Sequence, residues 1–288
     1  MDDSRWKKEN LRQLIINQRT EYLELGLDSQ NPEDSERDLF QAWLAHRLKL
    51  ISLIPEECRY PNKKAIDIGG GNGKLCCILT ALGLSCTNVD HMYLNETQLN
   101  NAGKPLIPLL KSYLKGKNIA VEALDINVDK FPNPDNSFDL AICSEAIEHL
   151  PNSPKPMLSE IYRILKPKGY FILTTPNQAA IGMRLRALRG HSIHDHIKGF
   201  YNMELYPVGA PFRGHVREYT LEELKYMLTQ EKYTIVKISN FSLTPDVDMI
   251  MKKWKIYSNR YLYKTIIYKI IDKVTPMLSN NFFILAQK

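Results

Sequence analysis

The fold is decided by the stretch Lys63-Lys64-Ala65-Ile66-Asp67-Ile68-Gly69-Gly70-Gly71-Asn72-Gly73-Lys74-Leu75. A short apolar segment contains a carboxylate near its end, glycines follow at every second position, and leucine and isoleucine then recur at helical spacing. This order predicts a strand, a tight loop and a helix. Glycine is needed where φ is positive or where a ligand lies against the backbone, because a Cβ would occupy that space. The loop at Gly69, Gly71 and Gly73 therefore predicts a nucleotide-type site.

The spacing of these glycines excludes two common phosphate-binding motifs. A dinucleotide fingerprint places its third glycine three residues after the second, where this chain has Lys74. A P-loop ends in Gly-Lys-Ser/Thr, and here Leu75 follows the lysine. Asp67 at the loop mouth repels a pyrophosphate and attracts a cation. An ammonium or sulfonium ligand is the better expectation, and the alternative is an ordinary glycine-rich turn.

Two further carboxylates follow predicted strands. Residues 84–90 predict a second strand that ends at Asp90, and residues 118–124 predict a third that Asp125 closes. A carboxylate at the end of the second strand can accept both hydroxyls of a ribose. Asp125 has an alternative role as a helix N-cap or turn residue. Three acidic strand ends in series favour a nucleoside site.

The rest of the chain continues the alternation of strand and helix, which predicts an α/β protein with a doubly wound, mostly parallel, seven-stranded sheet. Thr220 and Glu223 have the spacing of a helix capping box. We divide the chain into an N-terminal helical extension (1–58) and a main domain (59–288). Within the main domain we expect a variable insert at 178–214. We also expect a basic helical insert at 242–280, between the last two strands.

The glycine loop and two later phrases, Leu165-Lys166-Pro167-x-Gly169-Tyr170 and Thr174-Thr175-Pro176-Asn177, resemble class I S-adenosylmethionine-dependent methyltransferases. The similarity covers roughly residues 60 to 240 and is greatest to the small-molecule branch that includes the ubiquinone-biosynthesis O-methyltransferases. It implies a Rossmann-like methyltransferase domain and S-adenosyl-L-methionine as cofactor. In that family the loop holds the methionine part, an acid binds the ribose, and an acid and an apolar residue contact the adenine. The implied cofactor-binding residues are Asp67, Gly69, Gly71, Gly73, Asp90, Asp125, Ile126 and Ser144.

The candidate catalytic residues are Glu145, Glu148 and His149, directly after the fourth predicted strand. If a helix begins there, the three side chains share one face and could bind a divalent ion. This Glu-x-x-Glu-His pattern resembles that of the ubiquinone-biosynthesis O-methyltransferases and of the small-RNA 2′-O-methyltransferases. In the RNA enzymes a further histidine joins the metal, and His215 is the positional match. The alternative is a metal-free site in which these residues line the acceptor pocket and His149 acts as general base.

The net charge of +6 is concentrated near the C-terminus, where residues 249–288 hold eight basic residues and one acid. The amphipathic segment 249–274 predicts either peripheral contact with an anionic membrane or a helical cover packed on the core. The chain has no apolar run of membrane-spanning length and no C-x-x-C spacing. We expect a cytoplasmic protein, without a transmembrane segment, that is either free or peripheral to a membrane.

The leading functional hypothesis is O-methylation of a small molecule, a sugar or a lipid-linked intermediate. A second hypothesis is an RNA 2′-O-methyltransferase. The histidine pattern and the basic tail favour it, whereas the lack of an aromatic-basic RNA-binding signature argues against it. A third is an inactive, cofactor-binding partner subunit.

Overall fold

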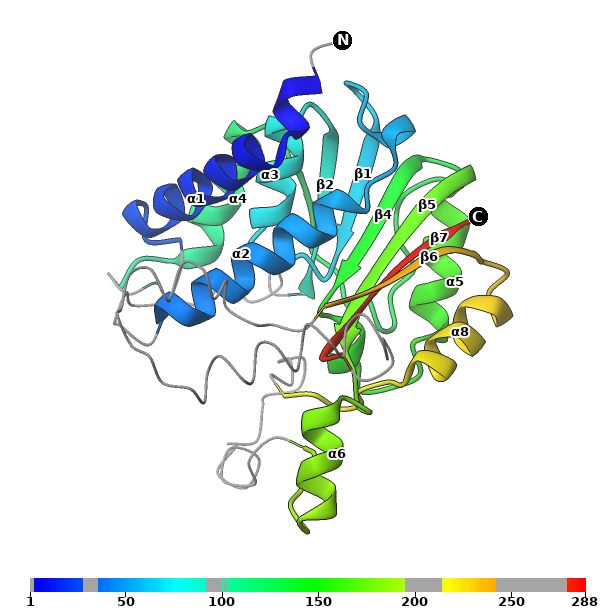
Figure 1. Cartoon of the computed structure of the whole chain (residues 1–288). Helices are drawn as coiled ribbons and strands as arrows, with labels where there is room; N and C mark the ends of the chain where they lie inside the picture. Colours follow the sequence, from blue (N-terminus) through cyan, green and yellow to red (C-terminus); the bar gives the residue numbers. More distant parts are fainter. Residues whose placement is uncertain (1–2, 28–35, 92–99, 101–102, 195–213, 242–278) are drawn as a thin grey trace.

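A seven-stranded sheet forms the centre of the protein in the computed structural model (Figure 1), which describes residues 3–27, 36–91, 100, 103–194, 214–241 and 279–288. The strand order is β3-β2-β1-β4-β5-β7-β6. The strands are β1 (Lys64–Ile68), β2 (Ser85–Val89), β3 (Ala120–Glu122), β4 (Phe138–Ser144), β5 (Leu165–Pro176), β6 (Thr234–Phe241) and β7 (Asn281–Gln287). The prediction of a mostly parallel, doubly wound sheet is confirmed.

Strand β7 is the exception to the parallel arrangement. Strands β1 to β5 pair in parallel, whereas β7 lies between β5 and β6 and runs antiparallel to both. The pairing of Thr174 with Phe283 brings the C-terminal strand beside the end of β5. Asn281, at the start of β7, therefore lies at the same edge of the sheet as the end of β4.

Helices cover both faces of the sheet (Figure 1). One buried cluster contains side chains of α1, α2, α3 and α4, and a second contains side chains of α5 and α8. The described helices are η1 (Asp3–Trp6), α1 (Lys8–Glu24), α2 (Glu36–Ser52), η2 (Glu56–Cys58), α3 (Lys74–Ala81), α4 (Leu106–Gly116), η4 (Ile147–His149), α5 (Lys155–Ile164), α6 (Ile181–Leu188) and α8 (Leu221–Gln230).

Successive residues of β5 point to opposite faces of the sheet, as the pleat of a strand requires. Ile172 belongs to the core beneath α1 to α4, whereas Phe171 and Leu173 belong to the core beneath α5 and α8. The same alternation sends the next two residues, Thr174 and Thr175, to opposite faces. This difference determines how the two candidate glutamates are placed.

Local sequence signals set several element boundaries. Thr220 accepts from the Glu223 N–H while the Glu223 carboxylate accepts from the Thr220 N–H, so the predicted capping box begins α8. The amphipathic segment 249–274 lies outside the described residues, as does part of the 178–214 insert. Among the helices that the structure describes, none has the length and apolar character needed to cross a bilayer.

Candidate active site

The glycine loop after β1 has the positive φ angles that its sequence predicts. Gly69, Gly71 and Gly73 have φ values of 70°, 54° and 78°. A Cβ on Gly69 would lie 2.6 Å from Ala146 Cβ, and one on Gly73 would lie 2.8 Å from Leu114 Cδ2. A Cβ on Gly71 would meet nothing within 4 Å. Gly69 and Gly73 thus permit close packing, whereas the space beside Gly71 is open.

Gly70, which the alternate spacing of the predicted glycines does not include, also has no room for a side chain. A Cβ there would lie 2.0 Å from Asn88 Oδ1 and 2.6 Å from Asp67 Oδ2. The Asn88 amide donates to the Gly71 carbonyl at 2.9 Å, so it holds the loop from β2. The Asn88 side chain is fully buried near the end of β2, which is known only from the assembled structure.

Asp67 is buried at the base of the loop, and Arg47 of α2 lies near it. Burial raises the pKa of Asp67 to about 7, with the Arg47 charge opposing and the Asp90 charge adding to the rise. Burial also lowers the pKa of Arg47, although Asp67 and Glu145 attract its charge. The buried Arg47 Nε has no hydrogen-bond partner among the described residues. A buried carboxyl group and a guanidinium group that can each bind a ligand atom of opposite charge therefore lie near one another at the base of the loop.

Asp90 lies against the loop, as expected for a ribose ligand. Its Oδ2 accepts from the Gly71 N–H at 2.8 Å, and its Oδ1 is 3.3 Å from His91 Nδ1. These contacts orient the carboxylate at the carboxyl end of β2, beside the open space at Gly71.

The other implied cofactor residues surround the same loop from β3 and β4. Asp125 Oδ1 accepts from the Asn127 N–H at 2.9 Å, which is the turn role considered as an alternative for this residue. Ile126 Cδ1 lies 3.4 Å from the position that a Cβ on Gly69 would take. Ser144, at the end of β4, shares a 2.9 Å hydrogen bond with Thr174.

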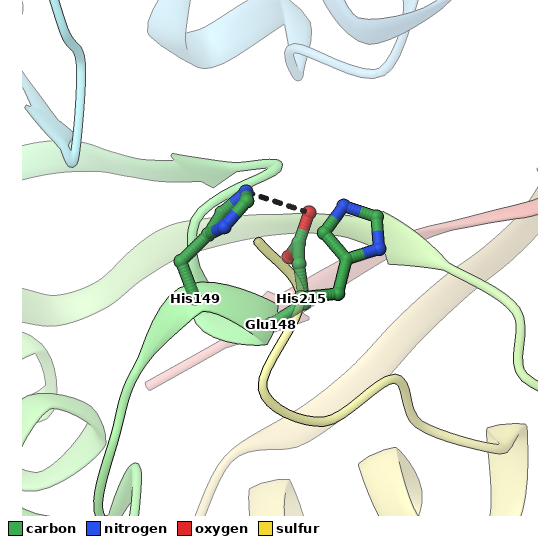
Figure 2. Close-up of side chains that lie close together, drawn as sticks. All are labelled: Glu148, His149 and His215. Carbon is green, nitrogen blue, oxygen red and sulfur yellow. Dashed lines mark ion pairs between the residues drawn. The ribbon is translucent and has the colours of Figure 1, made fainter. Parts of the chain in front are cut away.

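Glu148, His149 and His215 form a cluster in which the carboxylate lies beside two imidazole rings (Figure 2), and the rings are in edge contact, with centroids 5.0 Å apart. One potential ligand atom from each residue lies within 4.8 Å of the other two. The segment 214–217 reaches η4 because the N–H groups of Val216 and Arg217 donate to the Glu148 carbonyl at 2.8 and 3.2 Å. Residues far apart in the sequence are thus joined by backbone hydrogen bonds.

The orientation of both rings is fixed through Nδ1. His149 Nδ1 donates to the Gly214 carbonyl at 2.9 Å, and His215 Nδ1 donates to Glu218 Oε1 at 2.7 Å. When Nδ1 carries the proton, Nε2 of a neutral ring is the acceptor atom. Each ring can therefore accept a proton or bind a metal through Nε2.

Glu148 is a buried carboxyl group with an incomplete set of partners. Its exposed fraction is 1%, and Thr175 Oγ1 donates to Oε2 at 2.9 Å. Oε1 has no hydrogen-bond partner among the described residues and lies 3.9 Å from His149 Nε2. Burial and the charge of Glu145 raise the pKa of Glu148 to about 8. A proton or a cation would satisfy this group.

Glu145 does not join the cluster, so the expected helical face is wrong. Glu145 has a φ of 54°, and only the short 3₁₀ turn η4 follows β4. Its Oε1 accepts from His46 Nε2 at 3.2 Å and from Thr174 Oγ1 at 2.9 Å, and its Oε2 accepts from Asn281 Nδ2 at 3.1 Å. Burial opposes ionisation, but these partners lower the pKa of Glu145. Thr174 and Thr175 point to opposite faces of the sheet. Glu145 accepts a hydrogen bond from Thr174 and Glu148 from Thr175, so the two carboxylates also lie on opposite faces.

Comparisons with known proteins identify the class. The methyltransferase domain family matches residues 34–238, and the chain belongs to that family. Together with the sheet order and the glycine loop, this match makes the protein a class I S-adenosylmethionine-dependent methyltransferase. The predicted enzyme class is confirmed.

Among relatives, the chain is 28% identical over 178 residues to a ubiquinone biosynthesis O-methyltransferase of Rickettsia bellii, covering 59% of this chain and 68% of that protein. It is also 28% identical over 220 residues to a ubiquinone/menaquinone biosynthesis C-methyltransferase of Rickettsia prowazekii, covering 72% and 79%. The two names cover both O- and C-methylation.

A solved methyltransferase structure from Mesorhizobium loti matches with a TM-score of 0.53 at 17% identity, covering 86% of this chain and 98% of that one. One from Archaeoglobus fulgidus matches with a TM-score of 0.50 at 20% identity, covering 88% and 94%. At these identities, the likeness concerns the fold.

Proposed function

We propose that this enzyme transfers the methyl group of S-adenosylmethionine to an oxygen atom of a small molecule, a sugar or a lipid-linked intermediate. The observation that carries the proposal is the buried Glu148 carboxyl beside two imidazoles, whose Oε1 has no hydrogen-bond partner in the part of the chain that the structure describes. Such a cluster is suited to removing a proton from a hydroxyl group. The similarity to ubiquinone biosynthesis O-methyltransferases supports an oxygen acceptor.

The residues around the glycine loop fit the cofactor. In this proposal Asp67 holds the ammonium group and Arg47 the carboxylate of the methionine part, since one is a buried acid and the other has an unpartnered Nε. Asp90 accepts the ribose hydroxyls beside the open space at Gly71. Asp125 and Ile126 contact the adenine, and Ser144 lies at the boundary with the acceptor site.

His149 is the residue we assign to proton removal. The cofactor supplies a methyl group on a positively charged sulfur, so the protein need only align the acceptor and take its proton. His149 donates through Nδ1 to the Gly214 carbonyl, so Nε2 is the basic atom of the neutral ring and the one we assign to accept the hydroxyl proton. Glu148 Oε1 lies 3.9 Å from Nε2, and the ionised carboxylate, which prevails above its raised pKa of about 8, stabilises the imidazolium that forms.

A divalent metal is an additional proposal for the same cluster. Glu148, His149 and His215 would supply one oxygen and two nitrogen ligands, whereas Glu145 is engaged by other groups. A bound metal would lower the pKa of the acceptor hydroxyl. We expect added Mn²⁺ or Zn²⁺ to raise the melting temperature of the wild type but not of His215→Ala, and chelator to inhibit the wild type. Absence of both effects would remove the metal from the proposal.

RNA is a second candidate acceptor because His215 lies beside Glu148 and His149, as the similarity to small-RNA 2′-O-methyltransferases implies. For a lipid-linked acceptor, the basic segment 249–274 would provide contact with an anionic membrane. The test is methyl transfer from radiolabelled S-adenosylmethionine into separate metabolite, lipid and RNA pools. Label in a small-molecule or lipid fraction supports the first proposal, and label only in RNA would replace it.

A further inference from the structure

Tyr22 of α1 connects the N-terminal helices to the glycine loop. Its side chain is fully buried, and its hydroxyl donates to the Asn72 carbonyl at 2.8 Å. Asn72 stands between Gly71, which faces the open space, and Gly73, the N-cap residue of α3. A residue 50 positions upstream thus holds the backbone of the cofactor loop.

Each of the four carbonyl groups at residues 70–73 accepts a hydrogen bond. The Gly70 carbonyl accepts from the Gly73 N–H at 3.1 Å, and the Gly73 carbonyl accepts from the Cys77 N–H at 3.0 Å. The Gly71 carbonyl accepts from Asn88 at 2.9 Å. Of these four, only the Asn72 carbonyl has its partner in α1. Without that partner, a partly buried carbonyl would lose its hydrogen bond, at a cost to the loop conformation.

Aromatic contacts fix the position of the Tyr22 ring. Its centroid is 5.2 Å from that of Tyr113 on α4, with the rings at 86°. Lys74 Nζ, directly after the loop, lies 5.6 Å from the Tyr22 ring and 5.9 Å from the Trp43 ring. The Tyr22 ring, and with it the hydroxyl group, is therefore held in place by side chains of α3 and α4.

We propose that Tyr22 is a positioning residue for cofactor binding. Its hydroxyl fixes the Asn72–Gly73 peptide and so keeps the loop in the conformation that receives S-adenosylmethionine. Helix α1 precedes residues 34–238, so this contribution comes from outside the part of the chain that matches the family. The inference rests on the loop being the cofactor site.

The test compares Tyr22→Phe with Tyr233→Phe. Tyr233 is also buried, and its hydroxyl donates to the Leu158 carbonyl at 3.0 Å, in the other core and away from the loop. Both variants lose one phenol-to-carbonyl hydrogen bond. S-adenosylhomocysteine affinity is measured by calorimetry at a temperature where thermal melts show all three proteins folded.

We expect Tyr22→Phe to weaken S-adenosylhomocysteine about three- to tenfold, the usual worth of one such hydrogen bond, and Tyr233→Phe to leave the affinity unchanged. Without ligand, amide hydrogen exchange at residues 70–74 should be faster in Tyr22→Phe alone. Equal affinities in wild type and Tyr22→Phe, or equal losses in both variants, would overturn the proposal. A wild type that binds no S-adenosylhomocysteine would instead contradict the cofactor site itself.

Discussion

Glu145 and Glu148 are three residues apart at the end of the same strand, yet their environments differ. Glu145 accepts hydrogen bonds from His46, Thr174 and Asn281, and its pKa is lowered. Among the described residues Glu148 accepts one side-chain hydrogen bond, from Thr175, its Oε1 lies 3.9 Å from His149 Nε2, and its pKa is raised to about 8. A carboxylate whose hydrogen bonds are satisfied holds structure together, whereas one that lacks partners is available for chemistry.

The difference follows from the pleat of β5. Thr174 faces the core beneath α1 to α4, where His46 approaches, and Thr175 faces the core beneath α5 and α8, where the 214–217 segment approaches. Glu145 connects the end of β4 to α2 through His46 and to β7 through Asn281. The region around Glu148 is the proposed acceptor site. The following variants test this division.

The largest effect is expected for His149→Ala. Loss of a general base costs roughly 10²- to 10⁴-fold in turnover. Affinity for S-adenosylhomocysteine should stay close to that of the wild type, because His149 lies outside the cofactor residues. Glu148→Ala should behave in the same way. Steady-state kinetics and calorimetry on the same preparations give both quantities, and a parallel loss of cofactor binding would reject the assignment.

His46→Ala is expected to act on stability instead. The change removes a hydrogen bond to a partly exposed carboxylate and should lower the free energy of unfolding by about 1–2 kcal/mol. Turnover should fall far less than in His149→Ala. Denaturant unfolding measures the first quantity and steady-state kinetics the second. If His46→Ala reduced turnover as much as His149→Ala, the division between the two glutamates would be lost.

The smallest effect is a pH dependence that Asp67 introduces into cofactor binding. Its pKa of about 7 in the free protein means that the proton must leave before the carboxylate can hold an ammonium group. Affinity should therefore rise several-fold between about pH 6 and about pH 8 and then level off. Asp67→Asn should bind weakly and without this rise, and calorimetry across the range compares the two proteins.

The raised pKa of Asp67 has the opposite effect on the free energy of unfolding of the cofactor-free protein, which decreases as the pH rises. The folded state retains the Asp67 proton to a higher pH than the unfolded state, whose pKa is about 3.9. The contribution of Asp67 to stability is therefore largest at low pH and falls as the pH rises from about 4 to about 7. A stability that rose equally over this interval in wild type and Asp67→Asn would contradict the assigned shift.

The sequence predicted the sheet, the glycine loop and the capping box at Thr220, because periodicity and glycine spacing are local signals. It also predicted that His215 would join Glu148 and His149. It placed Glu145 wrongly because the positive φ there and the opposite faces of Thr174 and Thr175 depend on the assembled sheet. Arg47 and His46 were missed because only packing of α2 against the sheet brings them to the acids.

The most direct test of the central claim is S-adenosylhomocysteine binding, measured by calorimetry in wild type and Asp67→Asn at about pH 8. The account predicts clear binding by the wild type and about a 10- to 100-fold loss in Asp67→Asn, the usual worth of a charge-assisted hydrogen bond. Equal affinities in the two proteins, or no heat of binding in the wild type, would contradict it.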